Sequence, residues 1–199
     1  HNRVTQDANI ESQIFEGGYS ERQLFELIQN AADALHDARG RVEVRLTTDT
    51  LYVANEGRAL STDGLVSLMA SHISKKESDQ IGRFGLGFKS VLAVSDSPQV
   101  FSRSGSFGFN AESTRRRIKE LVPGLDKYPA TRLAEVLSFE AEAALDEHLR
   151  ELGEWATTIV RLPLRARRDE LSAEMRDFPT EFVLFSPQRQ PDAASVAAV

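Results

Sequence analysis

Helical and β-hairpin patterns alternate along the chain. Residues 21–39 place apolar side chains at helical spacing, and Gly40 supplies a stop. Short apolar stretches at 42–46 and 51–53 alternate with polar residues around a polar turn, which predicts a hairpin, and residues 99–110 predict a second one. This mixture predicts an α+β fold, a two-layer sandwich in which a mixed, largely antiparallel sheet has helices on one face.

The remaining pattern divides the chain into three parts. Residues 1–19 are expected to form a polar N-terminal arm, 20–187 the folded domain, and 188–199 a patternless tail or the start of a linker. Further predicted elements are helices at 62–69, 88–94, 112–121, 131–152 and 168–177, a strand at 157–164, an apolar segment at 182–185 and a polar loop at 71–80.

Composition excludes several protein classes. A chain of 199 residues with 41% hydrophobic residues can bury roughly 70% of its unfolded surface. The absence of cysteine excludes disulfides and thiolate metal sites and favours a cytoplasmic location. No apolar run is long enough for a membrane span. The net charge of −6 argues against a general nucleic-acid surface, and the basic run at 114–119 is expected to be a solvated helix face.

The first predicted helix has a polar stripe beside its apolar one. Glu26, Asn30 and Asp33 are spaced four and three residues apart, so they share one helix face. One interpretation is an ordinary solvated face. The alternative makes Glu26 a general base for water and Asn30 an oxygen ligand of Mg²⁺.

A glycine-rich segment at 81–90 precedes the helix predicted at 88–94. Its three glycines allow backbone amides to approach an anion closely, and a helix N-terminus favours phosphate. The alternative is a purely structural turn, because the segment lacks the lysine and hydroxyl residue that end a P-loop. Cations gather here in an otherwise acidic chain, namely Lys75, Lys76, Arg83 and Lys89.

Three motifs resemble those of one known family. Residues 26–34, Glu-Leu-Ile-Gln-Asn-Ala-Ala-Asp-Ala, resemble the first motif of the GHKL ATPases, which have the Bergerat fold. Residues 81–90 are similar to the phosphate loop of the heat-shock-chaperone branch, and most closely to sacsin-type domains. Residues 156–160 resemble the late Gly-Thr strand motif, with Ala156 where glycine is usual. The resemblance covers about residues 21–185.

The resemblance implies a domain that binds and hydrolyses ATP with Mg²⁺. Glu26 would be the catalytic base, Asn30 the Mg²⁺ ligand and Asp33 a support near the sugar or the lid. Lys89 or a lysine of the lid would neutralise phosphate charge, and Thr157 would reach the adenine side. The nucleotide-binding positions that it implies are Asn30, Asp33, Asn55, Gly57, Lys75, Gly82, Arg83, Phe84, Gly85, Leu86, Gly87, Phe88, Lys89 and Thr157.

One motif departs from the family pattern. Where the family has Asp-x-Gly-x-Gly, this chain has Asn55-Glu56-Gly57-Arg58-Ala59. Either the Asn55 carboxamide or the Glu56 carboxylate would then bind the adenine edge, and Asn55 is favoured because an amide can both accept and donate. Ala59 in place of the second glycine implies a stiffer lid hinge.

The function implied is ATP-driven conformational change in attached domains of a larger protein, similar to chaperones and sacsin, with a possible nucleotide-dependent dimer. The alternative is a nucleotide-dependent switch or a DNA-associated defence or repair ATPase with weak hydrolysis. A histidine kinase is disfavoured because no phospho-acceptor histidine helix is evident, and a non-binding scaffold is the fourth class. ATP and ADP are the expected ligands, and neither a membrane nor nucleic acid is expected as a partner.

Overall fold

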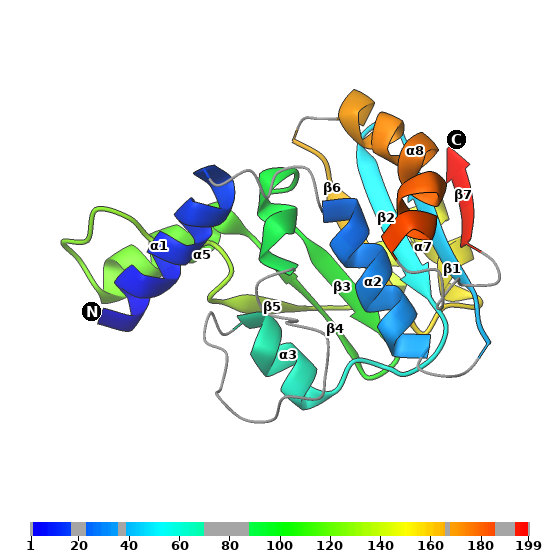
Figure 1. Ribbon diagram of the computed structural model, residues 1–199. Coiled ribbons are helices and arrows are strands. Elements are labelled where there is room, and N and C mark those ends of the chain that lie inside the picture. Colours follow the sequence, from blue (N-terminus) through cyan, green and yellow to red (C-terminus); the bar gives the residue numbers. More distant parts are fainter. Residues whose placement is uncertain are drawn as a thin grey trace.

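A seven-stranded sheet organises the chain. The computed structural model describes residues 2–16, 23–35, 39–69, 88–165, 168–185 and 194–198. The sheet has the order β5-β4-β3-β6-β2-β1-β7, and neighbouring strands are antiparallel except β1 and β7, which are parallel (Figure 1). The predicted α+β sandwich with a mixed, largely antiparallel sheet is confirmed. The strands are β1 Val42–Leu46, β2 Thr50–Asn55, β3 Gln99–Ser102, β4 Gly105–Phe109, β5 Ala134–Leu137, β6 Thr158–Pro163 and β7 Ala194–Ala198.

Helices connect and cover these strands. Both predicted hairpins are confirmed as β1–β2 and β3–β4. Ser61 caps α3, since its hydroxyl accepts a hydrogen bond from the Gly64 N–H at 3.0 Å. Phe88 and Lys89 are helical and lead into the 3₁₀ turn η2, Ser90–Ala93. The helices are α1 Asn2–Glu16, α2 Gln23–Leu35, α3 Thr62–Met69, α5 Ala111–Leu121, α6 Phe139–Ala143, α7 Glu147–Gly153 and α8 Arg168–Phe185.

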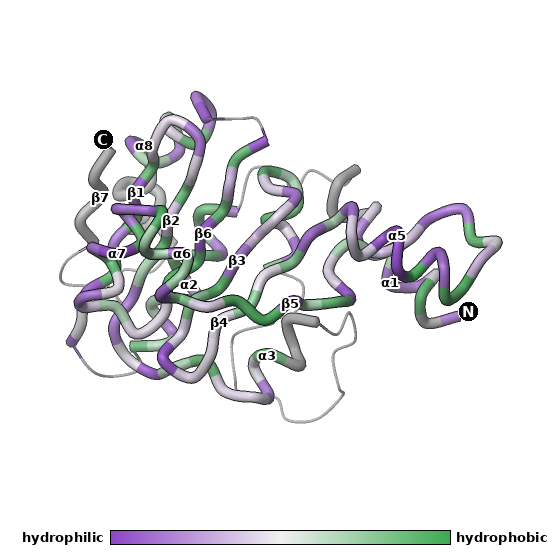
Figure 2. The backbone as a smooth tube through the Cα atoms, turned by 180° about the vertical axis from the view of Figure 1, so that it is seen from behind, coloured by the Kyte–Doolittle hydropathy of each residue, from purple (hydrophilic) through white to green (hydrophobic). Residues whose placement is uncertain are grey.

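The long helices α2 and α8 lie on one face of the sheet (Figure 1). Residues alternate between the two faces of a strand, and in β2 Leu51 and Val53 join the core cluster that contains the apolar face of α2. Tyr52 and Ala54 point to the opposite face and belong to a second cluster. Figure 2 shows hydrophobic residues along the strands of the sheet and hydrophilic stretches on the outlying helices.

The second face has a cover that the sequence did not predict. The short helices α6 and α7 pack there through Ala143, Leu149 and Leu152. Trp155 packs against the same cluster, and the Arg41 guanidinium lies over its ring at 4.1 Å. Both faces of the central strands are therefore buried.

Four expectations about secondary structure are wrong. Residues 1–19, expected to form a polar arm, contain α1. The sequence did not predict this helix, because its buried side includes Asp7 and Glu11 and so lacks an apolar stripe. The tail contains β7, which pairs with β1. The helix predicted at 131–152 is divided into β5, α6 and α7, since pairing with β4 overrides the helical propensity of 134–137. The apolar segment 182–185 is the end of α8.

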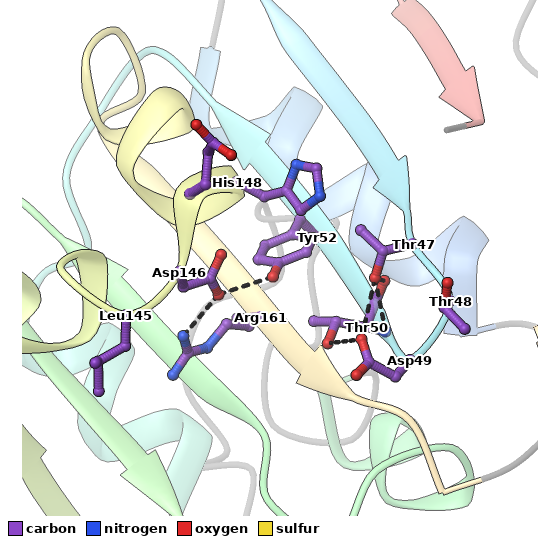
Figure 3. Close-up of a pocket in the computed structure, with 10 residues that line it drawn as sticks. Thr47, Thr48, Asp49, Thr50, Tyr52, Leu145, Asp146, His148 and Arg161 are labelled. Carbon is purple, nitrogen blue, oxygen red and sulfur yellow. Dashed lines mark hydrogen bonds and ion pairs between the residues drawn. The ribbon is translucent and has the colours of Figure 1, made fainter.

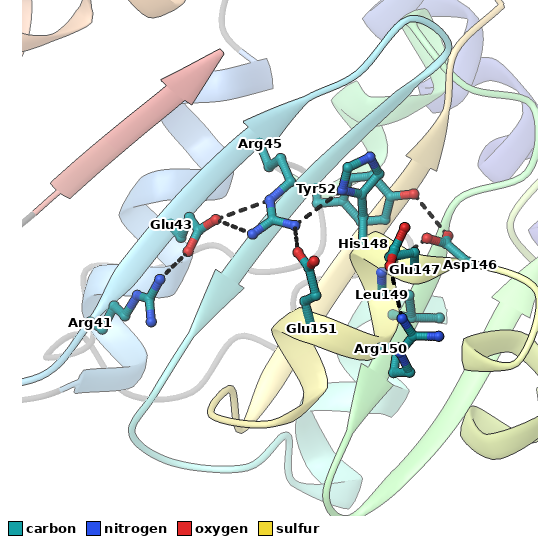
Figure 4. A network of polar contacts seen from close by, with 10 residues as sticks. All are labelled: Arg41, Glu43, Arg45, Tyr52, Asp146, Glu147, His148, Leu149, Arg150 and Glu151. Carbon is teal, nitrogen blue, oxygen red and sulfur yellow. Dashed lines mark hydrogen bonds and ion pairs between the residues drawn. The ribbon is translucent and has the colours of Figure 1, made fainter. Parts of the chain in front are cut away.

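Ion pairs lie along the second face of the sheet (Figure 4). The Arg45 guanidinium contacts Glu43 at 2.8 Å and Glu151 of α7 at 2.6 Å, and one of its nitrogens lies 3.1 Å from His148 Nδ1. Glu43 also contacts Arg41 at 2.5 Å. These contacts join the side of β1 that lies on the second face of the sheet to α7.

A second group of ion pairs surrounds Arg161 on β6. Its guanidinium donates to Asp146 at 2.8 Å and also to Glu142 and Gln99, and the Tyr52 hydroxyl donates to Asp146 at 2.8 Å. Burial disfavours the charged form of Asp146, but hydrogen bonds from the Leu149 N–H, Tyr52 and Arg161 outweigh it and lower the pKa. The folded state thus favours the carboxylate.

The variant Asp146→Asn is expected to lower the free energy of unfolding by about 1–3 kcal/mol, because the buried Arg161 and Tyr52 lose a charged acceptor. The folded-state pKa lies below the unfolded value of about 3.9, so the carboxylate stabilises the fold above that pH. This contribution is lost as the pH falls through the folded-state pKa. Urea unfolding between pH 6 and 2 measures it.

The matched control is Glu147→Gln, which alters the neighbouring exposed carboxylate. It is expected to change the unfolding free energy little at any pH. An Asp146→Asn chain that loses stability in acid as steeply as the parent would contradict the assignment.

Candidate functional site

The polar stripe of α2 is anchored by the apolar side of the same helix. Leu24, Leu27, Ile28 and Ala31 are buried in the main core cluster. Glu26, Asn30 and Asp33 lie within the one continuous helix Gln23–Leu35, on consecutive turns, and each is half-buried. Their predicted common face is thus compatible with a site beside the core.

The chain after β2 crosses the last turn of α2 in direct backbone contact. The Arg58 N–H donates to the Ala34 carbonyl at 2.9 Å. Gly57 has φ +99°, and a Cβ atom there would lie 2.4 Å from the Ala34 oxygen. Only glycine combines this conformation with this approach. The crossing brings the chain just after β2 against Ala34, the residue that follows Asp33.

Asn55 is the last residue of β2 and is buried, with 5% of its surface exposed. It has the strand parity of Leu51 and Val53, so it faces the α2 side of the sheet. Its Nδ2 donates to the Glu56 carbonyl at 2.6 Å, which orients the carboxamide. The Glu56 carboxylate instead accepts from the Arg41 N–H at 2.8 Å.

Thr158, a residue that the sequence analysis missed, lies opposite Asn55. The two are register partners in β2 and β6, so they share the α2 side of the sheet. The Thr158 hydroxyl lies 3.1 Å from the Ser102 hydroxyl. The expected residue, Thr157, precedes the strand and donates its N–H to the Asn55 carbonyl at 2.8 Å. Val160 and Leu162 pack in the core cluster on the α2 side, and Thr158 shares their strand face because it lies two residues before Val160.

Of the glycine-rich segment 81–90, the structure describes the last three residues, Phe88, Lys89 and Ser90. Phe88 is buried in the core cluster that includes the apolar face of α2, and its ring lies 6.1 Å from that of Phe109. Lys89 is 1% exposed, and its Nζ lies 3.6 Å from a Glu11 carboxylate oxygen. Burial lowers the pKa of Lys89, and Glu11 opposes this effect. Lys75, Gly82, Arg83, Phe84, Gly85, Leu86 and Gly87 lie outside the described residues.

The described site residues suit a metal bound jointly with phosphates. Among the residues that the structure describes, no group of three or more histidine or acidic side chains is placed to hold a metal ion. Mg²⁺ bound in a nucleotide complex needs only one or two protein oxygens, because phosphates and water supply the rest. The Asn30 carboxamide fits that requirement.

A separate cavity of about 490 Å³ lies on the opposite face of the sheet (Figure 3). It is open, and its walls come from the β1–β2 turn, β2, β6 and the start of α7. Arg161, Asp146 and Tyr52 in its wall are hydrogen-bonded to one another or to neighbours. It includes none of the residues predicted from the sequence.

No protein-family model matches the chain. It is 31% identical over 172 residues to the chaperone protein HtpG of Myxococcus xanthus. This alignment covers 69% of this chain and 26% of that protein. It is 28% identical over 180 residues to the mitochondrial heat shock protein 75 kDa of Bos taurus, and the alignment covers 73% of this chain and 26% of that protein. It is 30% identical over 149 residues to protein NO VEIN of Arabidopsis thaliana, and the alignment covers 72% of this chain and 5% of that protein.

The chain is therefore a distant relative of part of these heat-shock chaperones. It spans about a quarter of their length. Within the described part of the chain, no helix is both long enough and apolar enough to cross a membrane.

The variant Gly57→Ala is expected to lower the free energy of unfolding by about 2–5 kcal/mol, because a methyl group meets the Ala34 backbone in a strained conformation. Thermal or urea unfolding measures the loss. Gly124→Ala is the control, since Gly124 also has a positive φ of +83° but faces open space, and it should cost only about 1 kcal/mol. Equal losses in the two variants would contradict the close approach.

Proposed function

We propose that this chain is an ATP-binding domain that hydrolyses ATP with the help of Mg²⁺. The observation that supports this most is the convergence of three features on one side of the sheet: the polar stripe of α2, the Gly57 crossing and the buried Asn55. The distant relationship to heat-shock chaperones adds support. The proposed family is the GHKL ATPases with the Bergerat fold, in their chaperone and sacsin-like branch.

The adenine edge would meet Asn55. A carboxamide can accept a hydrogen bond from the adenine amino group and donate one to a ring nitrogen. Glu56 is the weaker candidate, because its carboxylate accepts from the Arg41 backbone. Thr158, in register with Asn55, offers a hydroxyl on the same side, so we assign it the role first expected of Thr157.

The phosphates would lie over the stripe of α2. Backbone amides of Gly82, Gly85 and Gly87 would contact them, and Lys75 and Arg83 would neutralise charge. Phe84, Leu86 and Phe88 complete this segment, with Phe88 anchored in the core. Asn30 would hold Mg²⁺, which neutralises charge along the phosphates when bound, and Asp33 would support the sugar or lid side.

Glu26 would be the catalytic base. It lies one turn before Asn30 on α2, so a carboxylate and a metal ligand share one helix face. From that position it would orient the attacking water and accept its proton. Positioning and charge stabilisation supply most of the catalysis in phosphoryl transfer.

In the whole protein, the domain would use ATP binding and lid closure to move attached domains, as a chaperone-like motor. A nucleotide-dependent dimer belongs to the same proposal. Nucleotide affinity without turnover would favour the alternative of a nucleotide-dependent switch.

Calorimetry with ATP, ADP and GTP, with and without Mg²⁺, tests the ligand class. We expect ATP and ADP to bind and GTP to bind at least tenfold more weakly, about 1.4 kcal/mol, because guanine presents the opposite donor pattern to Asn55. Asn30→Ala should reduce the benefit of adding Mg²⁺ without abolishing metal-free binding. Equal affinity for GTP would contradict the role of Asn55.

The variant Glu26→Ala is expected to lower single-turnover hydrolysis by roughly 10²–10⁴-fold while ATP affinity changes little. Glu112→Ala, at an exposed position of α5, is the control and should match the parent. Hydrolysis by Glu26→Ala at the parent's rate would remove Glu26 as the base.

A further inference from the structure

The helix α1 buries two carboxylates against the rest of the fold. Asp7 and Glu11 are 4% and 5% exposed, and their spacing of four residues puts them on one side of the helix. Figure 1 shows α1 lying at the end of the molecule beside α5, away from α8. Carboxylates are rarely this buried unless they are paired.

Glu11 has a full set of partners from a distant segment. Its carboxylate accepts hydrogen bonds from the N–H of Ala130 at 2.5 Å, the N–H of Thr131 at 3.2 Å and the Thr131 hydroxyl at 2.7 Å. Arg132, next in sequence, pairs with Asp7. Both buried acids of α1 therefore bind the segment before β5.

The same Glu11 carboxylate faces Lys89. Lys89 Nζ lies 3.6 Å from Glu11 Oε1, and Lys89 is among the most buried side chains in the described part of the chain. Phe88, its neighbour, is fixed in the main core. Burying an ammonium is costly unless a charge compensates it, and Glu11 supplies that charge.

We propose that Glu11 and Lys89 are positioning residues of the nucleotide site, and that Lys89 does not contact phosphate. Glu11 holds the Lys89 ammonium on the α1 side, and this contact fixes Phe88 and the start of η2. It makes α1 part of the nucleotide-binding unit. The inference rests on the proposed ATP-binding function.

The test uses Glu11→Gln, Lys89→Met and the double variant of the full chain. Urea unfolding is measured for each variant. ATP affinity is measured by calorimetry without urea, under conditions where circular dichroism shows that all variants are folded. The exposed pair Glu147 and Arg150, 2.9 Å apart, supplies the control cycle of Glu147→Gln and Arg150→Met.

Each single variant is expected to weaken ATP binding about five- to tenfold, and the double variant no more than the weaker-binding single one. The urea midpoint of the double variant should fall by less than the sum of the single shifts. The control cycle should leave ATP affinity unchanged.

Several outcomes would overturn the proposal. A phosphate-binding Lys89 predicts that Lys89→Met loses affinity, whereas Glu11→Gln keeps or gains it by freeing the ammonium. A merely structural pair predicts lower urea midpoints with unchanged ATP affinity. A parent chain that binds no ATP overturns the proposed function and the positioning role with it, while the urea cycle still reports whether the two residues are coupled.

Discussion

The burial of one side of α2 against the sheet determines where every other part of the proposed site lies. Leu27, Ile28 and Ala31 enter a cluster shared with β1 and β2. Each large apolar side chain buried in this way contributes about 1.5–3 kcal/mol, against about 0–1 kcal/mol for an exposed ion pair. The apolar contacts therefore fix the rotation of the helix. The rotation of the helix in turn determines where Glu26 and Asn30 lie.

The sheet separates two kinds of chemistry by strand parity. On β2 and β6, Asn55 and Thr158 face α2, whereas Tyr52 and Arg161 face α7. The first side keeps small neutral polar groups next to the core. The second binds its charges into ion pairs that attach α6 and α7. The central strands can thus contact a ligand on the α2 side and hold the supporting helices α6 and α7 on the other side.

The strongly periodic elements could be predicted from the sequence, and the elements defined by distant partners could not. The stripe of α2 and both hairpins show their burial in the local pattern. The buried side of α1 carries Asp7 and Glu11, which resemble solvent-facing residues until their partners near residue 131 are known. β7 depends on parallel pairing with β1, far away in the chain. The position of β7 therefore follows from the tertiary fold and not from its local sequence.

For the candidate site, the sequence indicates residue types but not which strand face or which partner each side chain meets. The structure brings the end of α2 and the chain after β2 together through the Arg58–Ala34 backbone hydrogen bond, and the roles of Asn30 and Asn55 in nucleotide binding stay predictions. A shift of one residue separates Thr157 from Thr158, and in a strand one residue reverses the face. Lys89 follows a glycine-rich segment, so the sequence favours a phosphate contact. Its acidic neighbour on α1 is visible only in the fold.

The contact between Glu11 and the Ala130 backbone spans 119 residues, and it also has a consequence for the order in which the chain can fold. A ribosome adds about 5–20 residues each second, so α1 emerges roughly 6–24 s before the groups that satisfy its acids. Until then Asp7 and Glu11 lack the partners that they have in the folded chain. The helix α1 can therefore make these contacts only after residue 131 has been synthesised.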